Sequence, residues 1–247
     1  MLGRYSISQA QGYGYFHYTM ENLVRIFIGL DLLKAHPTMK VVVNEPSKGF
    51  VKSTLSMLGI PEERMVQGPL SARVVVFPEP VGCGSPTMPM MQLMRRTLWG
   101  ALPPMPPPGS AKQVLVVRRR GSREVANHDD MMARLKSSAP AGVVFKEFEA
   151  SGSSRDQMAQ FAHSTVILAP HGAGLSNVIV ARPGTAVVEL NVPGNDYNAC
   201  YLFMSVKLGL RYYSTVPRGA SHGGKMNVDI DEVTGLVMKG LKAASGR

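Results

Sequence analysis

The apolar residues of this chain follow two alternating patterns, one typical of helices and one typical of strands. Between Tyr15 and His36 they recur at every third or fourth position, and this spacing predicts a helix with one apolar stripe. Short β-branched and aliphatic runs predict buried strands. The other elements expected in this part are a strand at 41–43, a helix at 51–58, a strand at 73–77 and a helix at 92–98. Such alternation is typical of a Rossmann-like half.

The second part of the chain alternates more regularly. It follows LPPMPPPG at 102–109, a stiff proline-rich stretch that suits a domain junction. We therefore expect an α/β fold with two domains, 1–105 and 106–247. The strands predicted here are 114–117, 142–145, 165–168 and 185–190, and the helices run from Asn127 or His128 to Lys136 and over 155–162, 175–181 and 231–243.

The most informative stretch is TVILAPHGAGLSNVIVARPGTAVVEL, residues 165–190. Its order of buried strand, glycine turn, helix and buried strand predicts a βαβ unit. Gly172 and Gly174 have no Cβ, so the backbone can approach a ligand closely, and free N–H groups at a helix start attract anions. Glu189, near the end of the second strand, is placed to bind ribose hydroxyls. The unit therefore suggests a nucleotide or nucleotide-sugar site.

One alternative stays open for the glycine turn. A tight turn between packed elements also explains a GxG sequence. The dinucleotide fingerprint, moreover, requires a third glycine where this chain has Asn177. The stretch thus predicts binding of phosphate or pyrophosphate, and it does not match the full fingerprint of a dinucleotide site.

The charge of the chain restricts its partners. The 247 residues carry a formal net charge of +10, and such a chain prefers phosphorylated ligands, nucleic acid or acidic glycans. The densest basic cluster, RRRGSR at 118–123, follows a predicted strand and lies at its carboxyl end, where open α/β sheets bind ligands. We expect Arg118 and Arg123 to contact phosphate, and Arg119 and Arg120 to face solvent, unless one of them turns into the sheet edge. Asn127 is expected to cap the next helix.

Several classes of protein are disfavoured. The apolar runs are shorter than a bilayer span requires, and the first residues contain no apolar core of a signal peptide. Basic residues are neither gathered on one helix nor interleaved with aromatic residues, which argues against nucleic-acid binding. Cys83 and Cys200 could form at most one disulfide and have no metal-ligand spacing.

Four stretches, in order, resemble glycosyltransferase family 61, whose members include plant xylan xylosyl- and arabinosyltransferases and O-linked N-acetylglucosaminyltransferases. They are YFHYTMENLVRI, LSMLGIPEERMV, VLVVRRRGSREVAN, and the span 158–190 with PHGAGLSN and PGTAVVEL. The resemblance covers most of residues 15–200. It implies a GT-B-like fold, in which two Rossmann-like domains face a cleft, the first on the acceptor side and the second binding the sugar nucleotide.

The resemblance also implies an activity. It suggests an inverting hexosyl- or pentosyltransferase that moves a sugar from a nucleotide sugar, expected to be a UDP-sugar, to a hydroxyl of a glycan or glycoprotein. No metal and no cofactor besides the donor substrate are expected. The base that deprotonates the acceptor is Glu21 or His17, which lie four residues apart on one helix face, although Glu21 could instead be a surface carboxylate paired with His17 or Arg25. The donor-binding residues expected are Arg118, Arg123, His171, Gly172, Ala173, Gly174, Leu175, Asn177 and Glu189.

The sequence also departs from the family. Typical members carry an N-terminal membrane anchor and a longer first domain, whereas this sequence begins just before the first motif. We expect the Golgi or another secretory-pathway lumen if an anchor precedes this sequence, and the cytoplasm otherwise. Where many members have Asp or another acid after the first-motif histidine, this chain has Glu21. Two alternative functions remain: a non-catalytic relative that binds glycans or nucleotides, and a basic nucleic-acid-binding protein.

Overall fold

The computed structural model describes residues 14–43, 49–67, 71–76, 78, 86–107, 112–193 and 199–245. The chain divides into two compact units. Unit 1 comprises Met1–Pro103 with Gly152–Gln157, and unit 2 comprises Pro104–Ser151 with Met158–Arg247. The division at 103/104 falls inside the proline-rich stretch. The segment 152–157 belongs to unit 1, where the backbone N–H of Ser154 donates to Ser53 Oγ at 2.8 Å.

Unit 2 is built on a parallel sheet of five strands. These are β3 (Lys112–Val117), β4 (Val143–Phe148), β5 (Val166–Pro170), β6 (Ala186–Leu190) and β7 (Arg211–Thr215), and they lie in the order β4-β3-β5-β6-β7. Each neighbouring pair is parallel. The predicted α/β class and the four predicted strands of this part are confirmed, whereas β7 had no counterpart among the predicted elements.

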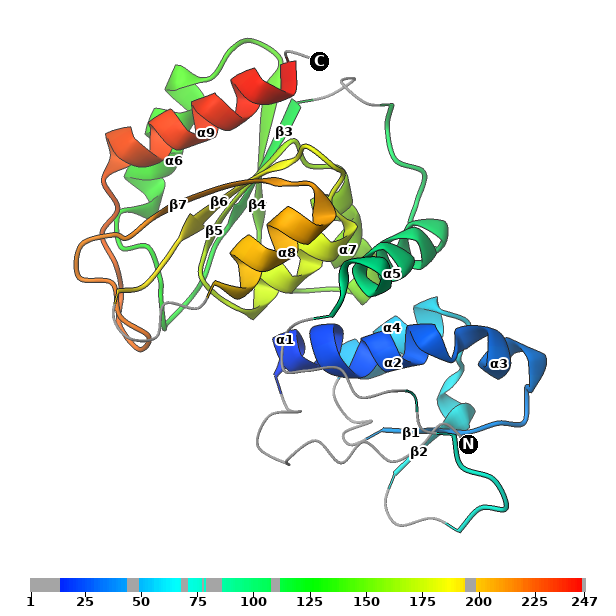
Figure 1. Ribbon diagram of the computed structural model, residues 1–247. Helices are drawn as coiled ribbons and strands as arrows, with labels where there is room; N and C mark the ends of the chain where they lie inside the picture. Colours follow the sequence, from blue (N-terminus) through cyan, green and yellow to red (C-terminus); the bar gives the residue numbers. More distant parts are fainter. Residues whose placement is uncertain are drawn as a thin grey trace. The chain divides into compact units, whose positions relative to one another are not determined.

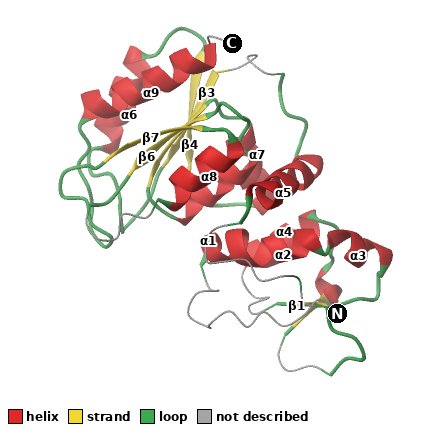
Figure 2. Ribbon diagram, viewed as in Figure 1, coloured by secondary structure: helices red, strands yellow, loops and turns green. Residues whose placement is uncertain are grey.

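Helices cover both faces of this sheet (Figures 1 and 2). On one face, α6 (His128–Ser138) and α9 (Ile230–Ser245) lie side by side, while the end of α7 (Ser154–Ala162) and α8 (Cys200–Leu208) cover the other. Because parallel strands are buried on both faces, they are apolar at nearly every position. β5 and β6 are buried along their whole length.

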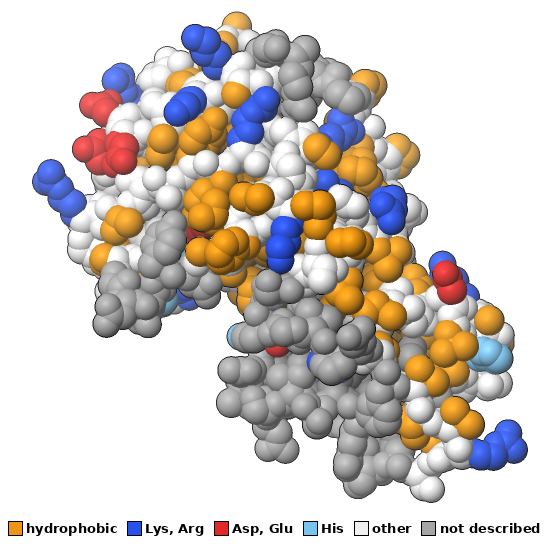
Figure 3. Space-filling model, in the orientation of Figure 1, with side chains coloured by type: hydrophobic (Ala, Val, Ile, Leu, Met, Phe, Trp, Pro, Cys, Tyr) orange, Lys and Arg blue, Asp and Glu red, His pale blue; other side chains and the backbone are white. Residues whose placement is uncertain are grey.

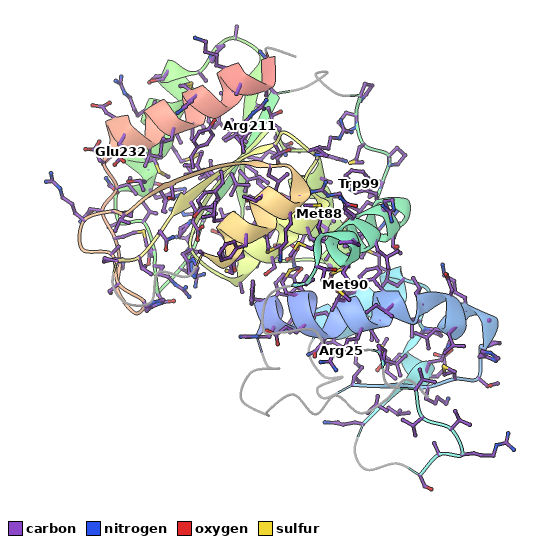
Figure 4. All side chains as sticks on the ribbon, in the orientation of Figure 1. Arg25, Met88, Met90, Trp99, Arg211 and Glu232 are labelled. Carbon is purple, nitrogen blue, oxygen red and sulfur yellow. The ribbon has the colours of Figure 1, made fainter. Side chains whose placement is uncertain are left out.

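Helix α9 is held at its start and along its face. Asp229 Oδ1 accepts a hydrogen bond of 3.0 Å from the backbone N–H of Glu232, which caps the first turn, and Glu232 itself extends from that turn in Figure 4. Further along, Gly240 lies so close to the sheet that an added Cβ would lie 2.7 Å from Ala186 Cβ. The absence of a side chain at Gly240 therefore allows α9 to pack directly on β6.

Unit 1 is mainly helical in its described part. The predicted helix from Tyr15 to His36 is present but not continuous: α1 (Tyr15–His17) runs into a π-helix, η1 (Tyr18–Asn22), then α2 (Leu23–Ile28), and after Gly29 into α3 (Leu30–Ala35). Helix α5 (Met88–Ala101), on which Figure 4 labels Met88 and Trp99, packs against α2. The remaining elements are β1 (Val41–Val42), α4 (Gly49–Met57), a short 3-10 helix, η2 (Glu62–Arg64), and β2 (Met65–Val66), which pairs with β1 in parallel.

The strand predicted at 73–77 is absent from its first part. Residues 73–75 form no strand, Val74 and Val75 are exposed to 63% and 42%, and Val76 forms a single β-bridge. A β-branched run predicts a strand only if a neighbouring strand and a covering layer are supplied, and sequence periodicity specifies neither. Phe77, at the end of the predicted strand, and residues 1–13 lie outside the described residues.

Candidate functional site

The carboxyl ends of β3 and β5 lie side by side in the middle of the sheet of unit 2. The strand order reverses here, because the chain passes from β3 outward to β4 and then returns to β5 on the other side of β3. In open α/β sheets, ligands bind at such a switch point. The arginine loop follows β3 and the glycine turn follows β5, so the structure brings the two predicted motifs together. With the end of β4 they line a pocket of about 390 Å³ that includes Arg118, Arg119, Arg120, Gly172, Gly174 and Leu175.

The glycine turn is closed by its own backbone. The N–H of Leu175 donates to the carbonyl of Gly172 at 2.9 Å, so this N–H is not available to a ligand, contrary to the predicted cradle from Gly172 to Leu175. The segment that follows is a 3-10 helix, η3 (Ala173–Val180), and not the predicted α-helix. Three consecutive β-branched residues at 178–180 and a glycine near the start disfavour α-helix here. The first N–H groups of such a helix have no intrahelical partner, which leaves those of Ala173 and Gly174 for an anion.

Gly174 faces open space in the pocket, and Gly172 makes room for Arg119. A Cβ added at Gly174 would meet nothing within 4 Å, whereas one at Gly172 would overlap Nη1 of Arg119. The Arg119 guanidinium is held in place by its Nε, which donates to the carbonyl of Ser122 at 3.0 Å. Burial and, second, the nearby charge of Arg123 lower the pKa of Arg119. Of the two arginines expected to face solvent unless one turned into the sheet edge, Arg120 is exposed and Arg119 turns inward, half-buried against the glycine turn.

The other arginines of the loop differ in how far their charge is neutralised. Arg118 Nη1 donates to Glu147 at 3.1 Å, and this bond, with the nearby Asp129, raises the pKa of Arg118. Arg120 is exposed and donates to Glu149 at 2.9 Å. Arg123 has a positive φ of 59°, and its buried Nε has no hydrogen-bond partner among the described residues. Within the part of the chain that the structure describes, Arg119 and Arg123 form no ion pair with a carboxylate. Of the two, Arg119 lines the pocket, whereas Arg123 lies outside its lining and close enough for its charge to act on Arg119.

Behind the glycine turn, His171 forms part of a buried polar cluster. Its Nδ1 lies 2.5 Å from Glu189 Oε1, and the hydroxyl of Tyr212 donates to Glu189 Oε2, also at 2.5 Å. The hydroxyl of Tyr201 donates to the carbonyl of Gly172 at 2.7 Å, and its ring packs edge-on to His171 with centroids 5.3 Å apart. Burial raises the pKa of Tyr201 well above its ordinary value, so this hydroxyl stays a donor at neutral pH. The cluster thus holds both the turn and the histidine.

Two predicted donor ligands do not fit this geometry. Glu189 is 0% exposed, and both of its oxygens already have hydrogen-bond partners, so the carboxylate supports His171 and is out of reach of a ribose. Asn177 is 1% exposed and lies inside η3, outside the lining of the pocket.

The predicted helix cap at Asn127 does not form. Asn127 precedes α6, but its side chain makes no capping bond and instead exchanges two hydrogen bonds with the backbone of Val228.

In unit 1, the predicted pair of His17 and Glu21 is in contact. Nδ1 of His17 lies 2.8 Å from Oε1 of Glu21, so the prediction that the two share one helix face is confirmed. Glu21 is buried in the π-helix, with 2% of its side chain exposed, whereas 31% of the His17 side chain is exposed. π-Helical turns often lie at functional sites. The arrangement is that of a buried carboxylate that orients an accessible imidazole.

A family model described as Glycosyltransferase 61 matches residues 15–188. This span contains both the His17–Glu21 pair and the pocket motifs, and it covers more than half of the chain. The chain belongs to the glycosyltransferase 61 family. The assignment confirms the resemblance inferred from the four sequence stretches.

The other comparisons add little to the family assignment. No curated protein matches the sequence. Among solved structures, a mutant flavo di-iron protein from Thermotoga maritima is 11% identical, with a TM-score of 0.34; the match covers 98% of this chain and 55% of that one. The chain thus spans about half the length of this protein. In the described part of this glycosyltransferase 61 member, no helix is long and apolar enough to cross a membrane, and no group of three or more His, Cys, Asp or Glu could hold a metal ion.

Some residues of the site were not found from the sequence of this glycosyltransferase 61 member. Arg119 was expected to face solvent unless it or Arg120 turned into the sheet edge, and Tyr201 and Tyr212 lie beyond residue 188, where the family match ends. Tyr212 lies on β7, which was not predicted. A signal for the cluster was nevertheless present, because Glu189 interrupts the apolar run of a strand that is buried on both faces and therefore needs buried donors.

Proposed function

We propose that this chain is an inverting glycosyltransferase that moves a sugar from a UDP-sugar to a hydroxyl of a glycan or glycoprotein. One observation carries the proposal: Arg119 has no carboxylate partner in the described part of the chain and lies against the glycine turn, at the switch point of a parallel sheet, with the charge of Arg123 nearby. Two such cations and free backbone N–H groups suit a diphosphate. The adjoining pocket of about 390 Å³ is in the usual range for a small ligand.

The reaction proposed is a single displacement at the anomeric carbon. As the acceptor oxygen forms its bond to this carbon, the bond from the carbon to the diphosphate oxygen breaks, and the acceptor proton passes to a base. Negative charge grows on the leaving diphosphate, where Arg119, Arg123 and the N–H groups of Ala173 and Gly174 would stabilise it. Since these groups supply positive charge themselves, we propose that transfer does not require a metal ion, and that activity survives a chelator such as EDTA.

For the base we favour His17 over Glu21. The carboxylate of Glu21 is nearly inaccessible and its Oε1 accepts from His17, whereas the imidazole of His17 is partly exposed. A histidine oriented by a buried carboxylate is a well-suited general base near neutral pH.

The GT-B arrangement and a location in the Golgi belong to the same proposal. Both rest on the family, whose members are generally secretory-pathway enzymes.

A thermal-shift panel of UDP, GDP, CMP and UDP-sugars tests the donor site. We expect UDP and one or more UDP-sugars to raise the melting temperature, because a ligand that binds only the folded state stabilises it by mass action. Arg119→Ala and Arg123→Ala should weaken this shift, whereas Arg134→Ala, whose charge is paired with Asp231 outside the pocket lining, serves as the matched control. If no nucleoside diphosphate shifts the melting temperature, the donor site is not here.

The two alternative functions have their own signatures. A non-catalytic relative would bind UDP but would release no UDP from any UDP-sugar, with or without an acceptor. A nucleic-acid-binding protein would show polynucleotide affinity that falls steeply with salt. On the face shown in Figure 3, the Lys and Arg side chains of unit 2 lie apart from one another, so this face offers a polynucleotide no basic stripe.

A further inference from the structure

A chain of hydrogen bonds runs from strand β7 through β6 to the glycine turn. The hydroxyl of Tyr212 donates to Glu189 Oε2, and Glu189 Oε1 lies 2.5 Å from Nδ1 of His171. Glu189 is 0% exposed and His171 is 7% exposed. His171 is the residue directly before Gly172, so the chain ends at the turn that lines the pocket.

The side-chain alternation of β6 explains why a carboxylate lies in the interior. Leu190 points into the apolar core beneath α6 and α9. Its neighbour Glu189 therefore points to the opposite face, where α8 places Tyr201. A buried carboxylate is costly unless donors reach it. In this protein the Tyr212 hydroxyl donates to one of the two oxygens, and the Nδ1 of His171 contacts the other.

We infer that Glu189 and Tyr212 are positioning residues, which keep a hydrogen of the His171 ring on Nδ1 and leave Nε2 as an acceptor next to the glycine turn. An ionised carboxylate has acceptors only, so the ring nitrogen that faces it carries hydrogen. Tyr212 occupies the second oxygen and so fixes the direction of the carboxylate. In a neutral imidazole, the hydrogen bond made by one ring nitrogen thereby decides whether the other ring nitrogen carries a hydrogen. The identity of the ligand rests on the proposed function, but the tautomer does not.

The test is 15N NMR of the histidine rings in the ligand-free full chain, combined with UDP binding by calorimetry. The His171 signals are assigned by their loss in His171→Gln. We expect protonation at Nδ1 in the parent. In Glu189→Gln the side-chain amide can donate to Nδ1, so the ring should lose this preference, and UDP affinity should fall on the order of tenfold, as for other orienting partners of histidine.

Two tyrosines of β7 provide a matched comparison. Tyr212→Phe removes one donor from Glu189 and should shift the His171 ring signals and weaken UDP binding. Tyr213→Phe should change neither, because Tyr213 packs on the opposite core and its ring lies 5.2 Å from Lys239 Nζ. Tyr212→Phe also decides the question if Glu189→Gln does not fold.

The outcomes separate this inference from the proposed function. A parent ring protonated on Nε2, or His171 signals that neither Glu189→Gln nor Tyr212→Phe moves, would overturn the positioning role. If the signals move as expected but the parent does not bind UDP, the positioning role stands and the proposed donor site fails.

Discussion

At the residue scale, the two glycines of the turn, which lie two positions apart, serve different purposes. Gly172 leaves space for a guanidinium, whereas Gly174 leaves space for a ligand, because a Cβ at Gly174 would meet no atom within 4 Å. A GxG sequence alone does not show this difference, since both residues are equally small. The structure assigns each glycine a neighbour, Arg119 in one case and the open pocket in the other.

Gly174→Val should therefore abolish UDP binding and leave the fold intact. The branched side chain would extend into the pocket, where the phosphate is proposed to lie, without meeting protein atoms. Its free energy of unfolding should stay within about 0.5 kcal/mol of the parent, as for other substitutions that disturb no contact. Calorimetry with UDP and a urea unfolding curve measure the two quantities. Gly235→Val, on the exposed side of α9, is the control, and parent-like UDP affinity of Gly174→Val would place the cradle elsewhere.

The pair in unit 1 leads to a second prediction at this scale. His17→Ala should lower turnover about 100-fold or more, the usual scale for a general base, with nearly unchanged UDP affinity. Glu21→Gln should also lower turnover, because the amide holds His17 less well than the carboxylate at 2.8 Å does. For each variant, steady-state kinetics measures turnover and a parallel titration with UDP measures donor affinity. Normal turnover in both variants would mean that the base is a residue outside this pair.

At the scale of elements, the parallel sheet determines which side chains become chemically important. Strand β6 is buried on both faces, so its single acid becomes an internal acceptor and not a surface ligand. The four strands predicted in this part are apolar runs, and apolar runs are visible in sequence. Strand β7, with the sequence RYYST, was missed because it is half-buried and polar, and only its register against β6 makes it a strand.

The contact between α9 and the sheet provides a prediction about stability. Gly240→Ala should destabilise the protein by about 1–3 kcal/mol, the usual cost of overpacking, because the new Cβ would lie 2.7 Å from Ala186 Cβ and 3.3 Å from Val166 Cγ2. Gly235→Ala in the same helix meets nothing within 4 Å, so it should stabilise by roughly 0.5–1 kcal/mol through helix propensity. Urea unfolding measures both. Equal effects of the two variants would mean that α9 does not pack this closely.

At the scale of the whole molecule, the net charge of +10 is less informative than its distribution. Arg118, Arg120 and Arg134 each pair with a carboxylate on another element. Paired charges contribute little to the attraction of a polyanion at physiological salt, because screening is strong at the surface. At the pocket, Arg119 has no carboxylate partner in the described part of the chain, and such a local charge suits the proposed diphosphate.

UDP and polynucleotides should therefore affect the molecule differently. At about 100 times its dissociation constant, UDP should stabilise the fold by roughly 2.7 kcal/mol. Single-stranded and duplex oligonucleotides should produce no comparable shift at 150 mM salt, and any binding at low salt should disappear steeply as salt rises. Thermal shift across a salt series measures this. Tight oligonucleotide binding that competes with UDP at 150 mM salt would favour the nucleic-acid alternative.

The sequence by itself determined the family, the α/β class and the position of the arginine loop and glycine turn at strand ends. These features depend on local order and periodicity, which a single sequence contains. The tertiary structure decided which side chains meet. Arg119, and not Arg118, packs against the glycine turn; Glu189 contacts His171 and is not free to bind a ribose; and Tyr212 donates to Glu189. Such pairs join residues far apart in the chain, and their contacts depend on strand order and on the face to which each side chain points, which are set only when the sheet assembles.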